Sequence, residues 1–327
     1  MKQIRVHRYG GPEVLTLEEL PTPKPSPGEV LVKVEATGIN FVETYQRTGQ
    51  VGYRFPLPYA PGSEGAGVVL EVGAGVSAFK PGDRVAWGNG VSGSYATHAI
   101  AAAERLVPIP PGVSARDAAA AMLQGMTAHY LTHTTYPLQP DETCLVHAAA
   151  GGVGALLCQL AHAKGARVIG TVGSREKVAI AKEAGADEVI LYREQDFQVE
   201  VMRLTGGRGV NVIYDGVGKD TFEQGLRSLA RRGFLVVYGQ ASGAVLPFDI
   251  QALADGGSTF VTRPKLLDHV VGSELQTRAA EVLRWVADGA LRLHIAKTYR
   301  LEQVAQAHID LAGRSLSGKL LLIPDAG

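Results

Sequence analysis

The chain has 327 residues, which is longer than one typical domain, so we expect two domains. Hydrophobic residues make up 46% of the sequence, which supports packed cores and excludes a disordered chain. Because 32 Lys and Arg residues balance 32 Asp and Glu residues, we expect no nucleic-acid partner and no membrane partner.

The start of the chain and its cysteines predict a cytoplasmic protein. The segment MKQIRVHRYGG alternates like a β-strand and does not resemble a signal peptide. No apolar run reaches the roughly 20 residues that a membrane span needs. We expect Cys144 and Cys158 to be buried free thiols of a reduced protein, and two cysteines cannot form a four-cysteine zinc site.

Residues 1–120 have the pattern of a small, partly closed β-barrel. The proline-rich loop PTPKPSPGEV leads into the alternating strand EVLVKVEATGI. Residues 66–87 are typical of a strand, a turn at KPGD and a second strand, and GSYATHAIAA adds another strand.

The pattern then changes to alternating strands and helices. A helix is expected over Ser114–Thr134, with Ser114 as its N-cap and Asp117 three residues later, and the sequence DTFE at 220–223 is expected to cap another. The expected strands are Cys144–Ala149, Arg167–Val172, Glu188–Leu191, Val210–Tyr214 and Phe234–Tyr238. This alternation predicts an α/β fold with a doubly wound parallel sheet.

The C-terminal tail departs from the alternation. An amphipathic helix in ELQTRAAEVLRWVADG ends at Gly289. A strand, a helix at Glu302–Ala312 and a last strand at Lys319–Ile323 follow. We therefore expect the tail to return to the first domain.

The stretch HAAAGGVG at 147–154 predicts a phosphate-binding turn, because it follows an apolar strand and opens a helix. It matches the second and third glycines of the dinucleotide fingerprint G-x-G-x-x-G, and Ala149 replaces the first. Gly151 would let the backbone approach a pyrophosphate, and Gly154 would let the helix pack on the strand. The N-terminus of the helix adds aligned N–H groups that favour an anion.

The end of the next strand selects the cofactor. An NAD site has an acidic residue about 20 positions further on, which accepts from the ribose 2′-hydroxyl. This chain has TVGSREK at 171–177, where Ser174, Arg175 and Lys177 suit a 2′-phosphate. Glu176 is expected to point elsewhere if Arg175 and Lys177 line one side. We therefore predict NADPH rather than NADH.

With these motifs in place, the chain resembles the medium-chain dehydrogenase/reductase superfamily, and within it the zinc-independent quinone oxidoreductases of the zeta-crystallin-like branch. The resemblance covers nearly the full length. It is carried by GGPEVL (10–15), GINFVETYQRTG (38–49), PGSEGAGVV (61–69), PGDRV (81–85), LQGMTAHYL (123–131), HAAAGGVG (147–154), YDGVG (214–218) and VTRP (261–264).

The resemblance implies a GroES-like catalytic domain made of residues 1–124 and 266–327, and a Rossmann domain, residues 125–265, with NADPH in the cleft between them. It also implies a homodimer that pairs the edge strand near STFVTR. By similarity the cofactor contacts Thr127, Gly151, Gly152, Val153, Gly173, Ser174, Lys177, Tyr192, Val217, Gly239 and Arg314. Lys319 receives no role, because the SGK stretch differs from that of some relatives.

The resemblance also predicts that no metal is bound. Zinc-bearing relatives have a cysteine at the position of Asn40 and a histidine at that of Ser63, and Glu64 alone does not form a three-ligand site. We expect His147 to be a packed residue rather than a ligand.

Without a metal or a general base, alcohol oxidation is disfavoured, because the hydroxyl must lose its proton. A quinone needs only a positioned hydride and a hydrogen-bond donor. We therefore predict an NADPH-dependent quinone reductase in which Asn40 donates to the substrate oxygen. Tyr45 and Tyr53 would supply hydroxyls and flat faces, and Arg263 would stabilise an oxyanion or touch the cofactor. Asp215 is expected to order its loop.

Two alternatives stay open. A reductase of α,β-unsaturated aldehydes, ketones or acyl thioesters uses the same metal-free hydride transfer, although no basic cluster for a CoA nucleotide is evident. A cofactor-binding structural or RNA-binding protein is the second, and the neutral charge speaks against RNA.

Overall fold

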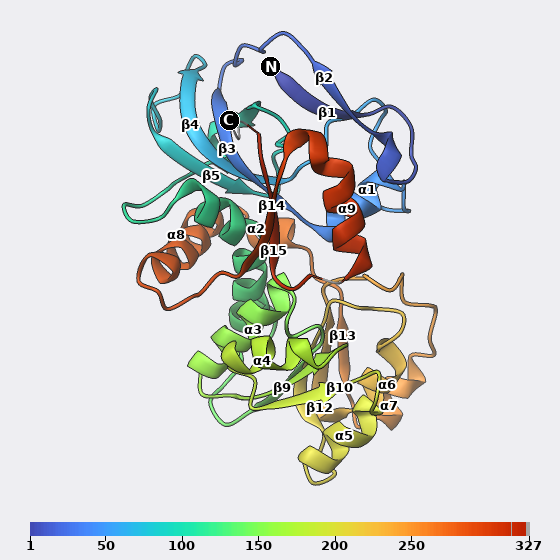
Figure 1. Cartoon of the computed structure of the whole chain (residues 1–327). Coiled ribbons are helices and arrows are strands. Elements are labelled where there is room, and N and C mark those ends of the chain that lie inside the picture. Colours follow the sequence, from blue (N-terminus) through green and yellow to red (C-terminus); the bar gives the residue numbers. More distant parts are fainter. Residues whose placement is uncertain (315, 325–327) are drawn as a thin grey trace. The chain divides into compact units, whose positions relative to one another are not determined.

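The computed structural model describes residues 1–314 and 316–324. By its contacts the chain divides into two compact units, which are described separately (Figure 1). Unit 1 comprises Met1–Met126 and Val270–Gly327, and unit 2 comprises Thr127–His269. The domain boundaries expected from the sequence, after residues 124 and 265, remain a prediction.

Unit 1 is built on a sheet with the strand order β14-β15-β3-β4-β5-β7, and β6 also pairs with β3. Its strands are β3 (Glu29–Ile39), β4 (Glu64–Val72), β5 (Arg84–Gly88), β6 (His98–Ala102), β7 (Val107–Pro108), β14 (Ile295–Arg300) and β15 (Lys319–Ile323), beside a hairpin of β1 (Lys2–Val6) and β2 (Leu15–Glu19). The β-rich first part is thus confirmed. The KPGD turn is confirmed as well, since the Asp83 N–H donates to the Lys80 carbonyl.

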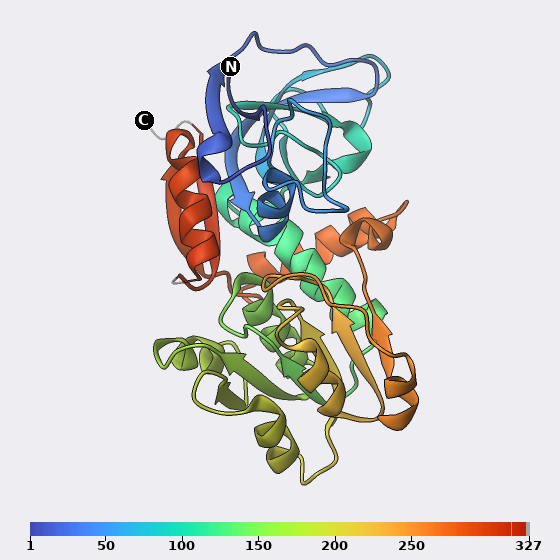
Figure 2. The same cartoon turned by 90° about the vertical axis from the view of Figure 1, so that its right-hand side faces the viewer.

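The tail returns to unit 1, as predicted. Strand β15 runs antiparallel to β3 with Leu321 opposite Gly38, and β14 runs parallel to β15. Helix α9 (Val304–Gly313) packs on β14 and β15 (Figure 2). Helix α8 (Glu274–Ala287) also belongs to this unit, as does α1 (Phe41–Arg47) after β3.

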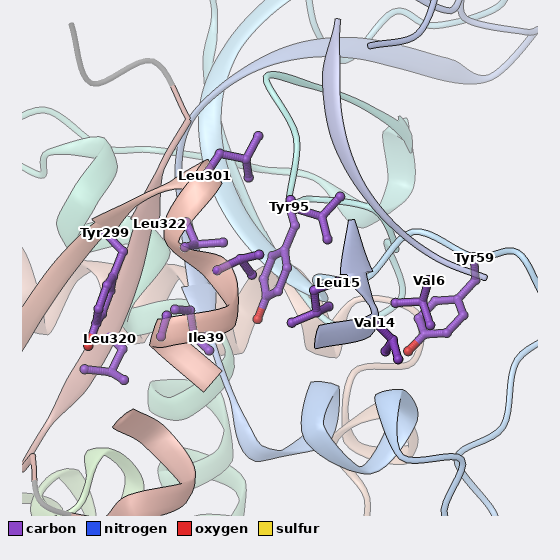
Figure 3. Close-up of a cluster of buried hydrophobic side chains, with 13 residues drawn as sticks. Val6, Val14, Leu15, Ile39, Tyr59, Tyr95, Tyr299, Leu301, Leu320 and Leu322 are labelled. Atoms are coloured by element: carbon purple, nitrogen blue, oxygen red, sulfur yellow. The ribbon is translucent and has the colours of Figure 1, made fainter. Parts of the chain in front are cut away.

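A buried apolar cluster fixes this arrangement. Side chains from β1, from the end of β3 and from β15 belong to this cluster (Figure 3). Its members include Val6, Ile39, Tyr95, Tyr299, Leu301, Leu320 and Leu322, all less than one tenth exposed. Their burial joins the two ends of the chain, and it brings the start of β15 to the end of β3.

Helix α2 (Ala115–Tyr130) begins as predicted, because the Asp117 N–H donates to the Ser114 hydroxyl over 3.0 Å. Its α-helical part ends four residues earlier than expected. A π-helical turn, Leu131–Thr135, follows it.

Unit 2 is a parallel sheet with the order β10-β9-β8-β11-β12-β13. The strands are β8 (Thr143–Val146), β9 (Arg167–Val172), β10 (Glu188–Leu191), β11 (Val210–Asp215), β12 (Leu229–Val237) and β13 (Phe260–Thr262). Numbered from β8, this is the order 3-2-1-4-5-6 of the dinucleotide-binding fold. The doubly wound α/β prediction is confirmed.

Helices cover both faces of this sheet. Helices α3 (Gly152–Ala163) and α4 (Glu176–Glu183) pack together, as do α5 (Phe197–Leu204) and α6 (Phe222–Arg227); α7 (Gln251–Asp255) is short. Leu145, Ile169 and Ile213 of the strands pack with Phe197 and Phe222 of α5 and α6 in one buried cluster. Cys144 and Cys158 are buried free thiols, as expected.

Two local expectations fail. Strand β8 ends at Val146 instead of Ala149, because the backbone of Ala148 turns into the left-handed region with a φ of 53°. Helix α6 begins within DTFE, as expected, with Thr221 as its N-cap. The Thr221 side chain, however, makes no capping hydrogen bond. Within the described residues, no helix has the length and apolarity of a membrane span.

Candidate functional site

The residues expected to bind the cofactor in unit 2 gather at one edge of its sheet. Gly151, Gly152 and Val153 follow β8, and Gly173 and Ser174 follow β9. Tyr192, Val217 and Gly239 come after β10, β11 and β12. Because all these strands are parallel, their carboxyl ends share an edge, which is where such folds bind nucleotides.

The glycine turn has the shape that a phosphate requires. Gly151 is the N-cap of α3 and has no side chain, so it leaves the first N–H groups of the helix open to an anion. The Gly151 N–H donates to the Ala148 carbonyl over 2.8 Å, which closes the turn. A Cβ on Gly154 would overlap the same carbonyl. The turn therefore fits a pyrophosphate, and only glycine fits at 154.

The end of β9 differs in part from the expectation. The Ser174 hydroxyl bonds to Glu176 and lowers the pKa of that carboxyl, so the expectation that Glu176 points elsewhere is wrong. Arg175 is paired with Glu194 over 2.9 Å. The Tyr192 hydroxyl lies 2.7 Å from the point where a Cβ on Gly173 would be, so these two predicted residues do lie together.

Two polar residues near this edge have structural roles, as predicted. The Asp215 carboxylate accepts from the N–H groups of Val217 and Gly218 and from the Thr221 hydroxyl, and so orders the loop after β11. His147 is buried with Nδ1 3.0 Å from the Thr171 hydroxyl, and burial lowers its pKa. Its ring is packed.

In unit 1, Asn40 is the centre of a buried polar cluster. It follows β3 directly, at the N-cap of α1, and is 5% exposed. Its Nδ2 donates to Glu64 Oε2 over 3.0 Å, and its Oδ1 accepts from Lys319 Nζ over 2.7 Å. Lys319 Nζ also lies 2.5 Å from Glu64 Oε2, and the N–H of Leu123 donates to Glu64 Oε1. The ion pair is almost completely withdrawn from solvent.

A second carboxyl lies in the same region. Glu43, in the first turn of α1, accepts from the backbone N–H groups of Asn40 over 2.7 Å and of Ser63 over 3.2 Å. Burial raises the pKa of Glu43 to about 7, although Lys319 and the Asn40 N–H act in the opposite direction. Glu43 thus fixes the backbone of the Asn40 segment.

The aromatic residues expected to meet the substrate do come together. The rings of Tyr45 and Tyr53 lie 5.2 Å apart in an edge-on arrangement, and Phe41 lies 6.4 Å from Tyr45. Both tyrosines are half-buried. An aromatic pair therefore follows Asn40 on the same segment of unit 1.

The other residues predicted to contact substrate or cofactor lie in four different segments of the chain. Arg263 is exposed and follows β13 in unit 2. Thr127 is buried in α2, and Lys177 is half-buried in α4. Arg314 is exposed at the end of α9 in unit 1, with a φ of 54°.

Comparison with known proteins agrees with this geometry. Residues 26–111 match the alcohol dehydrogenase GroES-like domain, and residues 152–288 match the zinc-binding dehydrogenase family. The chain is 44% identical to the quinone oxidoreductase of Pseudomonas aeruginosa over 99% of both chains, and 42% identical to quinone oxidoreductase 1 of Escherichia coli over 98% and 99%. The crystal structure of the Escherichia coli quinone oxidoreductase complexed with NADPH aligns with a TM-score of 0.96 at 41% identity, covering 99% of this chain and 100% of that one.

The chain belongs to the quinone oxidoreductases of the medium-chain dehydrogenase/reductase superfamily. A 2-haloacrylate reductase of Burkholderia is also similar, with 39% identity over 98% of each chain.

Sequence reasoning missed one residue of the polar cluster around Asn40 in this quinone oxidoreductase, namely Lys319. Lys319 binds both Asn40 and Glu64, two of the residues that the sequence analysis compared with the zinc site of relatives. A signal was present, because a lysine that opens the apolar strand KLLLI is an unusual residue to bury. Within the described residues, no group of three or more His, Cys, Asp and Glu side chains could hold a metal.

Proposed function

We propose that the chain reduces a quinone with NADPH and without a catalytic metal, and that Asn40 is the donor to the substrate oxygen. One observation supports this above the others: the Asn40 amide is buried, and both its ends are held, by Glu64 and by Lys319. An amide fixed in this way is a preorganised donor, which stabilises charge that develops on an oxygen without reorganisation.

The carboxyl edge of the unit 2 sheet is the cofactor side of the proposal. Bound NADPH supplies a hydride from its nicotinamide ring. The N–H groups at Gly151, Gly152 and Val153 bind the pyrophosphate, and Ser174 and Lys177 bind the 2′-phosphate. Gly173, Tyr192, Val217, Gly239, Thr127 and Arg314 complete the set of cofactor contacts.

The segment after Asn40 is the substrate side. Tyr45 and Tyr53 offer ring edges and faces to a flat, conjugated substrate, and Arg263 stabilises the oxyanion or touches the cofactor. A quinone suits these residues, because charge arriving with the hydride spreads over conjugated oxygens and needs only a donor.

The Lys319 ammonium supplies a positive charge at this site in place of a metal ion. A metal here would need lone pairs of Glu64 and Asn40, and Lys319 already occupies one oxygen of each. A fixed positive charge therefore lies where the zinc-bearing relatives have their ligands.

The second candidate is a reductase of activated alkenes. The similarity to a 2-haloacrylate reductase favours it, since that protein acts on an α,β-unsaturated acid by its name. The same donor and hydride serve both reactions. Turnover on 9,10-phenanthrenequinone, a small enal and an enoyl-CoA, each with NADPH, separates the two, and a quinone that is the poorest substrate would overturn the main proposal.

Assembly and location complete the proposal. We expect a homodimer through β13, which ends the described sheet of unit 2 and carries Phe260, 45% exposed and stacked on Phe234. We also expect a cytoplasmic protein with no nucleic-acid partner, in keeping with its zero net charge. Light scattering of the purified protein tests the dimer.

The decisive variant is Asn40→Ala. It should lower kcat with a quinone by about 100-fold while the Kd for NADPH stays the same, because the donor is lost and the cofactor edge is untouched. Asn211→Ala is the matched control. The Asn211 amide oxygen accepts from the Thr143 N–H near the starts of β11 and β8, at the opposite end of these strands from the cofactor edge. That control should lose stability and keep its kcat. An unchanged kcat in Asn40→Ala would refute the role of the amide.

A further inference from the structure

Lys319 is a buried cation that neither the dinucleotide fold nor the hydride transfer accounts for. It is 3% exposed and opens β15, and its two partners, Asn40 and Glu64, lie 279 and 255 residues away in the sequence. Burying an ammonium is costly unless it is paired and hydrogen-bonded. Here the ammonium is paired with the Glu64 carboxylate and hydrogen-bonded to the Asn40 oxygen.

The backbone is shaped around this cation. Gly38 lies opposite Leu321 in the β3–β15 ladder, two residues before Asn40, and Leu321 lies two residues after Lys319. A Cβ on Gly38 would overlap the Glu64 carboxylate and would lie 2.7 Å from Lys319 Nζ. The missing side chain thus provides the space in which the ion pair lies.

The cluster leaves Asn40 only one amide orientation. With Oδ1 toward Lys319 Nζ and Nδ2 toward Glu64 Oε2, every contact joins a donor to an acceptor. The flipped amide would place its NH₂ group against the ammonium and its oxygen against the carboxylate. Gln124 Nε2, 3.4 Å from Oδ1, supports the same orientation. Nδ2 carries a second hydrogen, and we assign this hydrogen to the substrate oxygen.

The charges act through the same bonds. An ammonium on the amide oxygen withdraws electrons, and this strengthens the N–H groups at the other end as donors. It also offsets the Glu64 carboxylate, which would otherwise oppose negative charge on a substrate oxygen nearby.

We propose that Lys319 is a positioning residue for quinone reduction: it holds and polarises the Asn40 amide. The proposal rests on the donor role of Asn40 given above. It goes further, because it assigns the orientation of that donor to a lysine from the opposite end of the chain.

A double-mutant cycle on Lys319 and Glu64 tests this, with Lys319→Met, Glu64→Gln and the double variant. Lys319→Met removes the charge and keeps an unbranched side chain. We expect it to lower kcat with 9,10-phenanthrenequinone by about 30-fold and to leave the KM for NADPH unchanged. In the Glu64→Gln background, Lys319→Met should still lower kcat at least about 10-fold, because Asn40 loses its contact with Lys319 whether or not Glu64 is charged.

The cycle distinguishes positioning from simple charge balance. If Lys319 only neutralises Glu64, its replacement costs nothing once Glu64 is neutral, and kcat of the double variant equals that of Glu64→Gln. That outcome would overturn the proposal, as would a change in KM alone. Should Lys319→Met not fold, the comparison within the Glu64→Gln background still decides, because no unpaired carboxylate remains there.

A matched control and a rescue complete the design. Lys297→Met removes a lysine from the neighbouring strand β14, where Lys297 pairs with Asp310 and is half exposed, and it should leave kcat unchanged. Lys319→Arg keeps the positive charge and should recover more of kcat than Lys319→Met. If Asn40→Ala loses its kcat but Lys319→Met does not, the donor role stands and only the role of Lys319 fails.

Discussion

Replacing Glu43 by glutamine should change how the stability of unit 1 depends on pH. Glu43 is completely buried, and burial raises its pKa from an ordinary value of 4.5 to about 7. Between these two values the folded chain keeps the proton that the unfolded chain has lost. The free energy of unfolding therefore falls as the pH rises from 4.5 to about 7, and is constant above that. The interval corresponds to about 3 kcal/mol.

Two buried histidines act in the opposite direction. Burial lowers the pKa of His308 to about 3, and it lowers the pKa of His147 as well. Their unfolded forms bind protons below about pH 6.5, so they make the protein more stable as the pH rises toward that value. The pH profile of the natural chain therefore mixes both effects, and only its difference from that of Glu43→Gln isolates Glu43.

The assay uses the two tryptophans of the chain, Trp87 and Trp285, which both belong to unit 1. Urea unfolding followed by their fluorescence at pH 5, 6, 7 and 8 gives the free energies for both proteins. Relative to the natural chain, Glu43→Gln should gain about 2–3 kcal/mol across this range. Loss of one acceptor for the Asn40 or Ser63 N–H is a constant offset, independent of pH. A difference that does not change with pH would refute the raised pKa.

Two further variants test the close packing at each site. Gly38→Ala should destabilise unit 1 by about 1–3 kcal/mol in the same fluorescence assay, because the added Cβ meets the Lys319–Glu64 pair. The control Gly313→Ala, whose Cβ meets open space, should not measurably change the free energy of unfolding, and equal effects of the two variants would contradict the packing. Ala148→Gly should raise the stability by about 1 kcal/mol, since Ala148 is exposed and has a φ of 53°, whereas Ala149→Gly at a buried position should lower it. Thermal unfolding followed by circular dichroism measures this second pair, and a less stable Ala148→Gly would argue against strain at the turn.

Local pattern predicted most of unit 2, and there is a physical reason for this. Strands Arg167–Val172 and Glu188–Leu191 have the predicted bounds, because short apolar runs between turn residues define them. The glycine turn is likewise a local signal, as strand, turn and helix follow one another directly in the chain. Strand β8 ends before Ala148, and β12 begins at Leu229 instead of the expected Phe234. Both differences coincide with residues in the left-handed region, Ala148 and Arg232, and so depend on backbone geometry.

The polar cluster of unit 1 could not be predicted in this way. Lys319 meets Asn40 only because β15 pairs with β3 in one register, and the apolar cluster of both chain ends sets that register. Glu176 was misplaced for a similar reason, since its contact with Ser174 depends on a side-chain conformation that charge pattern does not determine. Contacts between residues more than 200 positions apart need the folded chain.

We propose hydride transfer from NADPH to a quinone at a site built from Asn40, Glu64 and Lys319 instead of a metal. The most direct measurement is NADPH oxidation with 9,10-phenanthrenequinone before and after dialysis against a chelator, with zinc analysis of the same sample. Turnover should be equal in both samples, and faster with NADPH than with NADH. Turnover that disappears with the chelator and returns with zinc would contradict the proposal.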